Sequence, residues 1–72
     1  MSSINPFVDL SIIVPAYNEE LRLPPTLAKL DAFLRTQPLR YEIVVVDDGS
    51  KDKTCEVVTQ HMLTIANLRL VR

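Results

Sequence analysis

The 72-residue chain is long enough for one small domain, and a chain of this size buries only roughly 60% of the surface that its unfolded form exposes. Hydrophobic residues make up 47% of it and charged residues 24%, a balance typical of globular proteins that argues against disorder. The formal net charge of -1, with both signs interspersed, predicts no electrostatic attraction to nucleic acid or to acidic membranes.

The single cysteine and the N-terminal segment indicate in which cellular compartment the chain is expected. Cys55 is the only cysteine, so an internal disulfide and a CxxC metal or redox pair are both excluded, which fits a reducing setting. The segment from Met1 to Pro6 lacks the basic-then-apolar plan of a signal peptide. The apolar runs are strand-sized, far below the roughly 20 residues of a membrane span. We expect a cytoplasmic segment without a membrane span, which in a longer protein could lie at the cytoplasmic face of a membrane.

The first expected strand is Leu10–Val14, which follows an irregular lead-in over residues 1–7. Its β-branched run suits a strand buried on both faces of a parallel sheet. Pro15 cannot donate a hydrogen bond to the sheet ladder, so the strand is expected to end about there. A cluster of polar side chains follows directly, within residues 15–20.

The next segment has the pattern of a helix. Its leucines recur at helical spacing, at Leu23, Leu27, Leu30 and Leu34. Pro24 and Pro25 are tolerated only in the first turn of a helix, and Pro38 follows the expected C-terminus as a stop signal.

The clearest strand is Tyr41–Val46. It is broken by the turn residues Asp47, Asp48, Gly49 and Ser50. A second helix is expected to begin near Ser50 to Asp52, either of which could cap it, and to end at Asn67. Its apolar stripe consists of Cys55, Val58, Met62 and Ile65. Leu68–Arg72 is expected to begin a third strand.

This β-α-β-α-β order predicts an α/β fold with parallel strands and right-handed crossovers. The carboxyl ends of parallel strands meet at one edge of the sheet, and ligands of open α/β sheets bind beyond that edge. The polar clusters after Val14 and Val46 should therefore lie side by side, as one half of a nucleotide site.

Asp47 and Asp48 follow a strand, in which consecutive side chains point to opposite sides. One of them can therefore accept a hydrogen bond from a base N–H or a ribose hydroxyl, while the other holds a neighbouring loop. Gly49, the only glycine, lies where a positive φ or a close backbone approach is expected. The structural alternative is a turn that merely caps the next helix.

The residues after the first strand allow a similar choice. Tyr17 offers an aromatic face for a planar base, and Asn18 and Glu19 offer hydrogen bonds to a sugar ring. The alternative is a loop that begins a helix, with Tyr17 covering the core.

Several other sites are excluded or disfavoured. With one glycine, neither a GxGxxG turn nor a phosphate-binding P-loop can form, and no GxSxG elbow is present. His61 reads as a solvated helix residue and Cys55 as a small core residue. Lys51, Lys53 and Arg69 read as surface charges, with Lys51 near a phosphate only if its loop folds inward.

Two segments together resemble a known family. Ser11–Glu20 and Glu42–Thr54 strongly resemble the N-terminal part of family 2 glycosyltransferases. The element Arg22-Leu23-Pro24 is most similar to the branch that moves glucose from UDP-glucose to dolichyl or other polyprenyl phosphates. The mannosyl-transferring branch, which uses GDP-mannose, is the alternative.

The resemblance implies a Rossmann-like GT-A fold, of which residues 1–72 would be a partial domain, the nucleotide-binding N-terminal segment. It also implies a nucleotide-sugar site in which Asp48 hydrogen-bonds the uracil. The residues implied for this site are Pro15, Ala16, Tyr17, Glu19, Asp47 and Asp48.

The family's Asp-x-Asp motif, which holds Mg²⁺ or Mn²⁺ on the diphosphate, has no counterpart in these 72 residues. The resemblance therefore implies that the catalytic groups, the metal ligands and the site for the lipid-phosphate acceptor belong to a longer enzyme. That enzyme would transfer the sugar with inversion, by direct displacement, and the isolated chain would be inactive.

Two further hypotheses are alternatives to the glycosyltransferase resemblance. Phospho-receiver domains also place an Asp pair after an apolar strand, but after the first strand, with an acceptor Asp after the third. Here the pair follows the second strand, and the third reaches Arg72 without an Asp. The second reading is a structural fragment that binds nothing.

Overall fold

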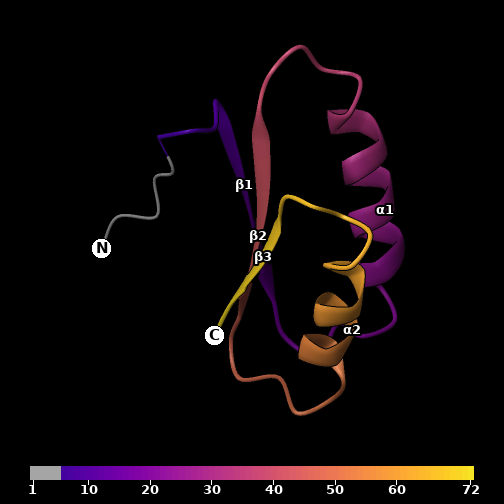
Figure 1. Cartoon of the computed structure of the whole chain (residues 1–72). Helices are drawn as coiled ribbons and strands as arrows, with labels where there is room; N and C mark the ends of the chain where they lie inside the picture. Colours follow the sequence, from indigo (N-terminus) through magenta and orange to yellow (C-terminus); the bar gives the residue numbers. More distant parts are fainter. Residues whose placement is uncertain (1–5) are drawn as a thin grey trace.

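The computed structural model describes residues 6–72, so residues 1–5 of the predicted lead-in lie outside the described part. The elements in chain order are β1 (Leu10–Ala16), α1 (Leu23–Leu34), β2 (Tyr41–Asp47), α2 (Thr54–His61) and β3 (Leu68–Val71). The three strands form one parallel sheet in the order β1-β2-β3 (Figure 1). The predicted α/β fold and its β-α-β-α-β order are confirmed.

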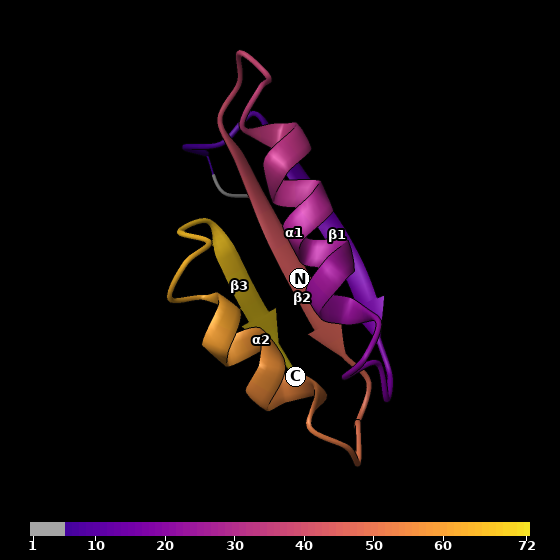
Figure 2. The same cartoon turned by 90° about the vertical axis from the view of Figure 1, so that its right-hand side faces the viewer.

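Both helices cover the same face of the sheet (Figures 1 and 2). This follows from the strand order, because two crossovers of the same hand that step in the same direction place their helices on one side. The core lies between that face and the helices. Its buried members are Ala16, Leu23, Leu27, Leu34, Ile43, Val45, Val58, Ile65 and Leu68.

The first strand ends at Ala16, one residue past Pro15, close to the predicted end. The prediction that it is buried on both faces was wrong, since Ile13 keeps 49% of its surface exposed. Among the described residues β1 pairs only with β2, so it is an edge strand, where a proline can be accommodated without losing a ladder bond. The outer face of β1 is open because both helices lie on the other face.

The first helix was predicted correctly, and Pro24 and Pro25 lie in its first turn. The second helix is shorter than predicted. It begins at Thr54, with Lys53 as an N-cap that makes no side-chain hydrogen bond, and it ends at His61. The Thr64 amide donates to the His61 carbonyl in the tight turn that follows, and this turn carries Ile65 into the core without a helix. Neither helix is long and apolar enough to span a membrane, within residues 6–72.

The face of the sheet opposite the helices carries a buried carboxylate. Glu42 is 4% exposed, its Oε2 accepts a hydrogen bond from the Ser11 hydroxyl at 2.5 Å, and its Oε1 pairs with Arg69 Nε at 3.1 Å. The Ser11 hydrogen bond, with that of Arg69, outweighs burial and holds the pKa of Glu42 below its ordinary value. Arg69 is exposed, as predicted for a surface charge, and its ion pair with Glu42 ties β3 to β2.

Candidate functional site

The two predicted polar clusters meet at the carboxyl ends of β1 and β2. The last residues of the strands are paired in register, Pro15 with Val46 and Ala16 with Asp47. Beyond the ladder, the Asp48 amide donates a hydrogen bond of 2.9 Å to the Ala16 carbonyl oxygen. The backbone thus remains joined one residue past the sheet, which places the residues that follow each strand next to one another.

Asp47 and Asp48 have separate surroundings, as the alternation of a strand predicts. Asp47 is buried, and its Oδ2 accepts hydrogen bonds from the amides of Gly49 (3.1 Å) and Ser50 (3.0 Å). Hydrogen bonding by Ser50, and also by Gly49, outweighs burial and holds the pKa of Asp47 below its ordinary value. Gly49 has φ +78, the left-handed conformation that glycine adopts readily. Asp47 therefore holds the turn, whereas Asp48 is exposed.

The residues around the end of β1 also differ in exposure. Pro15 is exposed and Ala16 is buried in the core. Tyr17 keeps 51% of its surface exposed, so its side chain is not buried in the core. Glu19 is half-buried, and its Oε1 pairs with Arg22, at 2.7 Å from Nη2 and 2.9 Å from Nε. Pro15, Tyr17 and Asp48 are all exposed at this end of the sheet and remain accessible to a ligand.

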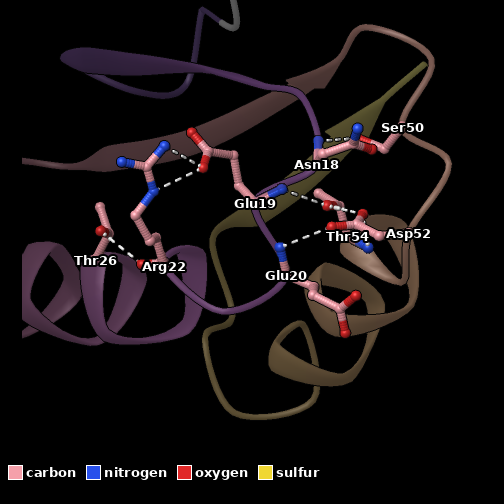
Figure 3. Close-up of polar contacts among 8 residues, drawn as sticks. All are labelled: Asn18, Glu19, Glu20, Arg22, Thr26, Ser50, Asp52 and Thr54. Carbon is pink, nitrogen blue, oxygen red and sulfur yellow. Dashed lines mark hydrogen bonds and ion pairs between the residues drawn. The ribbon is translucent and has the colours of Figure 1, made fainter.

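Hydrogen bonds that the sequence did not predict join the loop after β1 to the loop after β2 (Figure 3). The Asn18 amide donates to the Ser50 hydroxyl oxygen at 2.9 Å, and the Lys51 amide donates back to Asn18 Oδ1 at 2.8 Å. Asn18 has a φ of 52, which asparagine tolerates better than most residues. Its side-chain oxygen, predicted as a hydrogen-bonding group for a sugar, is therefore engaged with the neighbouring loop. Lys51 is exposed.

Two further amides of the loop after β1 donate hydrogen bonds to side chains that lie at or just before the start of α2. The Glu19 amide donates to Thr54 Oγ1 at 2.8 Å, and the Glu20 amide donates to Asp52 Oδ2 at 3.3 Å. The sequence predicts Ser50 and Asp52 only as possible helix caps and assigns no role to Thr54, so these contacts between the loops were not predicted. The available signal was a run of short polar side chains directly after a turn.

A pocket of about 280 Å³ opens beside these hydrogen bonds. It is lined by Asn18, Glu19, Glu20, Leu21, Arg22 and Asp52. Another hollow, of about 420 Å³, is lined by residues of α1, among them Asp31 and Arg35, and by His61, Thr64 and Ile65 at and after the end of α2. His61 is half-buried and its Nδ1 lies 2.9 Å from the Val57 carbonyl oxygen, so it is less solvated than predicted.

The described residues do not fit a metal ion. Across residues 6–72, no three or more His, Cys, Asp or Glu side chains are grouped so that they could hold one. Cys55 is half-buried, and burial, followed by the neighbouring Asp47 carboxylate, raises the pKa of its thiol. The site can offer a stacking surface, hydrogen-bond acceptors and a fixed loop, but it contains no arrangement of ligands for Mg²⁺ or Mn²⁺.

Comparisons with known proteins agree on one family. Residues 11–72 match glycosyl transferase family 2. Over 70 residues the chain is 43% identical to the dolichyl-phosphate beta-glucosyltransferase of Dictyostelium discoideum, an overlap of 88% of this chain and 21% of that protein. It is 50% identical over 58 residues to the protein of the same name from Drosophila melanogaster, covering 74% and 18%.

A bacterial relative carries a different sugar in its name. The undecaprenyl-phosphate 4-deoxy-4-formamido-L-arabinose transferase of Serratia proteamaculans is 37% identical over 59 residues, which cover 82% of this chain and 18% of that protein. The chain thus spans about a fifth of the length of the curated relatives it matches.

Proposed function

Since this chain belongs to glycosyltransferase family 2, we propose that it forms the nucleotide-binding part of an enzyme that transfers glucose from UDP-glucose to a dolichyl or other polyprenyl phosphate. The family resemblance read from the sequence is confirmed by the match over residues 11–72. Support for the glucose donor and the lipid acceptor comes from the names of the relatives in Dictyostelium and Drosophila. The hydrogen bond from the Asp48 amide to Ala16 carries the proposal, because it brings the two strand-end clusters together.

We further propose specific roles for the residues at this edge. Pro15 and Tyr17, which are two positions apart in the chain, are both exposed and supply the apolar surface on which uracil lies. Asp48, which is exposed on the neighbouring strand end, accepts a hydrogen bond from the uracil N–H. Asp47 supports Asp48 by holding the turn, and Glu19 contributes through the loop that its amide anchors. Ala16 contributes its backbone, because its side chain is buried in the core.

The remaining parts of the reaction are assigned to residues that these 72 do not include. We propose that a divalent metal, held elsewhere in the enzyme, stabilises the leaving diphosphate. A lipid phosphate is largely ionised near pH 7, since the second pKa of a phosphate ester is about 6, and it can attack the anomeric carbon with little help from a base. A lipid acceptor places the reaction at a membrane surface, and we propose the cytoplasmic face.

The test uses a hybrid enzyme in which this chain replaces the matching stretch of the Dictyostelium relative. The hybrid and the isolated 72-residue chain are each incubated with labelled UDP-glucose, dolichyl phosphate and Mg²⁺. We expect the hybrid to transfer glucose and the isolated chain to transfer none.

Three results would contradict the proposal. Transfer by the isolated chain above a blank without protein would show that the catalytic groups are misplaced. A hybrid that uses only GDP-mannose would show that the donor is wrong. A folded hybrid that binds no UDP would support the reading of this chain as a structural segment without a ligand.

A further inference from the structure

We propose that Thr54 is a positioning residue whose buried hydroxyl holds the loop after β1 in the shape that binds the nucleotide. This inference rests on the proposed function, because the loop in question carries Tyr17 and Glu19. Thr54 belongs to another element, the first turn of α2, and it lies 35 positions further along the chain than Glu19. It makes no contact with the nucleotide in this proposal and acts through the loop.

The surroundings of Thr54 are unusual for a polar side chain. Its residue is 0% exposed, so its hydroxyl must find partners within the protein. Oγ1 accepts a hydrogen bond of 2.8 Å from the Glu19 amide and donates its own proton to Asp52 Oδ1. Both capacities of the hydroxyl are therefore used, one toward the loop after β1 and one toward its own loop.

Asp52 fixes the direction in which this hydroxyl points. Its Oδ1 accepts from both the amide (2.9 Å) and the hydroxyl of Thr54, while its Oδ2 accepts from the Glu20 amide at 3.3 Å. Because the hydroxyl proton is directed at Asp52, a lone pair of Oγ1 remains for the Glu19 amide. Figure 3 shows the hydrogen bonds from the amides of Glu19 and Glu20 reaching the neighbouring side chains of Thr54 and Asp52.

Polar contacts, and not apolar packing, hold the middle of the loop after β1. Leu21 keeps 85% of its surface exposed, so no apolar anchor fixes the middle of the loop. Asn18 adopts a left-handed φ of 52, which is uncommon for a residue other than glycine and persists only where neighbouring contacts determine it. Three consecutive amides, from Asn18 to Glu20, all donate to side chains of residues 50–54. Thr54 is the buried member of that acceptor set.

The test compares three variants that separate the hydroxyl from the volume of the side chain. Thr54→Val keeps the shape and removes the hydroxyl, and Thr54→Ser keeps the hydroxyl and removes a methyl group. Thr59→Val is the matched control, because Thr59 lies on the same helix, is exposed, and bonds only the Cys55 carbonyl.

Hydrogen exchange of the isolated chain is the first measurement, and it needs no ligand. We expect exchange of the Glu19 amide to accelerate about tenfold or more in Thr54→Val, since its acceptor is lost. We expect it to stay within about threefold of the parent in Thr54→Ser and in Thr59→Val. The Val45 amide in the middle of the sheet should be unchanged in all three. Unchanged exchange at Glu19 in Thr54→Val, with Val45 also unchanged, would overturn the inference.

Kinetics of the hybrid enzyme form the second measurement. We expect Thr54→Val to raise KM for UDP-glucose about tenfold and to leave kcat within about threefold, because binding of the nucleotide is weakened equally in the ground and transition states. Thr54→Ser should restore KM. A merely structural defect would instead lower the amount of active enzyme at an unchanged KM, and that result would overturn the positioning role. A parent hybrid that binds no UDP would refute the proposed function, while the exchange result would still decide whether Thr54 holds the loop.

Discussion

The hydroxyl of Tyr41 donates a hydrogen bond of 2.8 Å to Oδ1 of Asp31, which joins the first residue of β2 to the buried side of α1. Asp31 is 7% exposed, and its other oxygen pairs with Arg35 Nε at 2.9 Å. Burial, and then the hydrogen bond to Asp31, raises the pKa of Tyr41. The pair lies at the end of the sheet opposite the proposed nucleotide site, so it contributes to stability and not to ligand binding.

We predict that Tyr41→Phe lowers the free energy of unfolding by about 1–2 kcal/mol, because a buried carboxylate loses one of its two partners. A urea titration of the chain at low protein concentration, followed by circular dichroism, measures the change. Tyr17→Phe is the matched control: its ring is half exposed, and we expect a change below about 0.5 kcal/mol. Equal effects of the two substitutions would show that the Asp31 contact stabilises nothing.

Asp47 predicts a dependence of stability on pH. Its pKa is lowered in the folded chain, so its ionised form stabilises the fold above the unfolded value of about 3.9, and this contribution is lost as the pH falls through the folded value. Asp47→Asn should therefore reduce the free energy of unfolding at pH 7, with a deficit that shrinks below about pH 4. Urea titrations from pH 7 to pH 3 measure both curves. Asp48→Asn, at the exposed neighbouring position, is the control, and its free energy of unfolding should match that of the parent chain. A deficit for Asp47→Asn that stays constant over this pH range would contradict the role given to the Asp47 charge.

Asp48 is predicted to recognise uracil. Asp48→Asn keeps the shape of the side chain but replaces an acceptor oxygen by a donor group. An unmatched hydrogen bond costs about 1–3 kcal/mol, so UDP should bind the hybrid enzyme roughly tenfold more weakly or worse. Calorimetry measures the affinity. Asp9→Asn is the control, because it makes the same change just before β1, at the opposite end of the strands, and it should leave UDP binding intact. Weaker UDP binding in both variants, or in neither, would contradict the role of Asp48 in the site.

The open edge of the sheet predicts self-association of the isolated chain. Among the described residues β1 pairs on one side only, and Ile13 is exposed on its outer face. Unpaired apolar edges of this kind template pairing with other chains, and a lysine suppresses it. Ile13→Lys should therefore raise the monomeric fraction seen by light scattering. Phe33→Lys, which removes a 62% exposed ring from α1, should not do so, and the reverse order would place the association on the helices.

The order of elements was predictable because it depends on local patterns. The leucine spacing of α1, the prolines in its first turn and the β-branched run of β2 each determine an element within about ten residues. Parallel strands then require crossovers of one hand, so the meeting of the two polar clusters followed from chain order alone.

Other features depended on contacts between distant residues. The end of α2 at His61 was not predictable from the sequence. Ile65 continues the helical spacing of apolar residues, although it reaches the core from a turn and not from the helix. The course of β1 through Pro15 depended on its place at the edge of the sheet, and Arg69 acquired an ion pair because strand pairing places it beside the buried Glu42.

The sequence by itself determined which residues stand at the carboxyl ends of β1 and β2, since strand ends and turn residues are local properties. Only the tertiary structure decided which of them are accessible and which hold the loops. Thr54 and Glu19 are 35 positions apart, and a hydrogen bond over that separation forms only after the sheet has set two loops side by side. The physical reason is that a polar side chain can satisfy its hydrogen bonds in many local ways, and packing selects one of them.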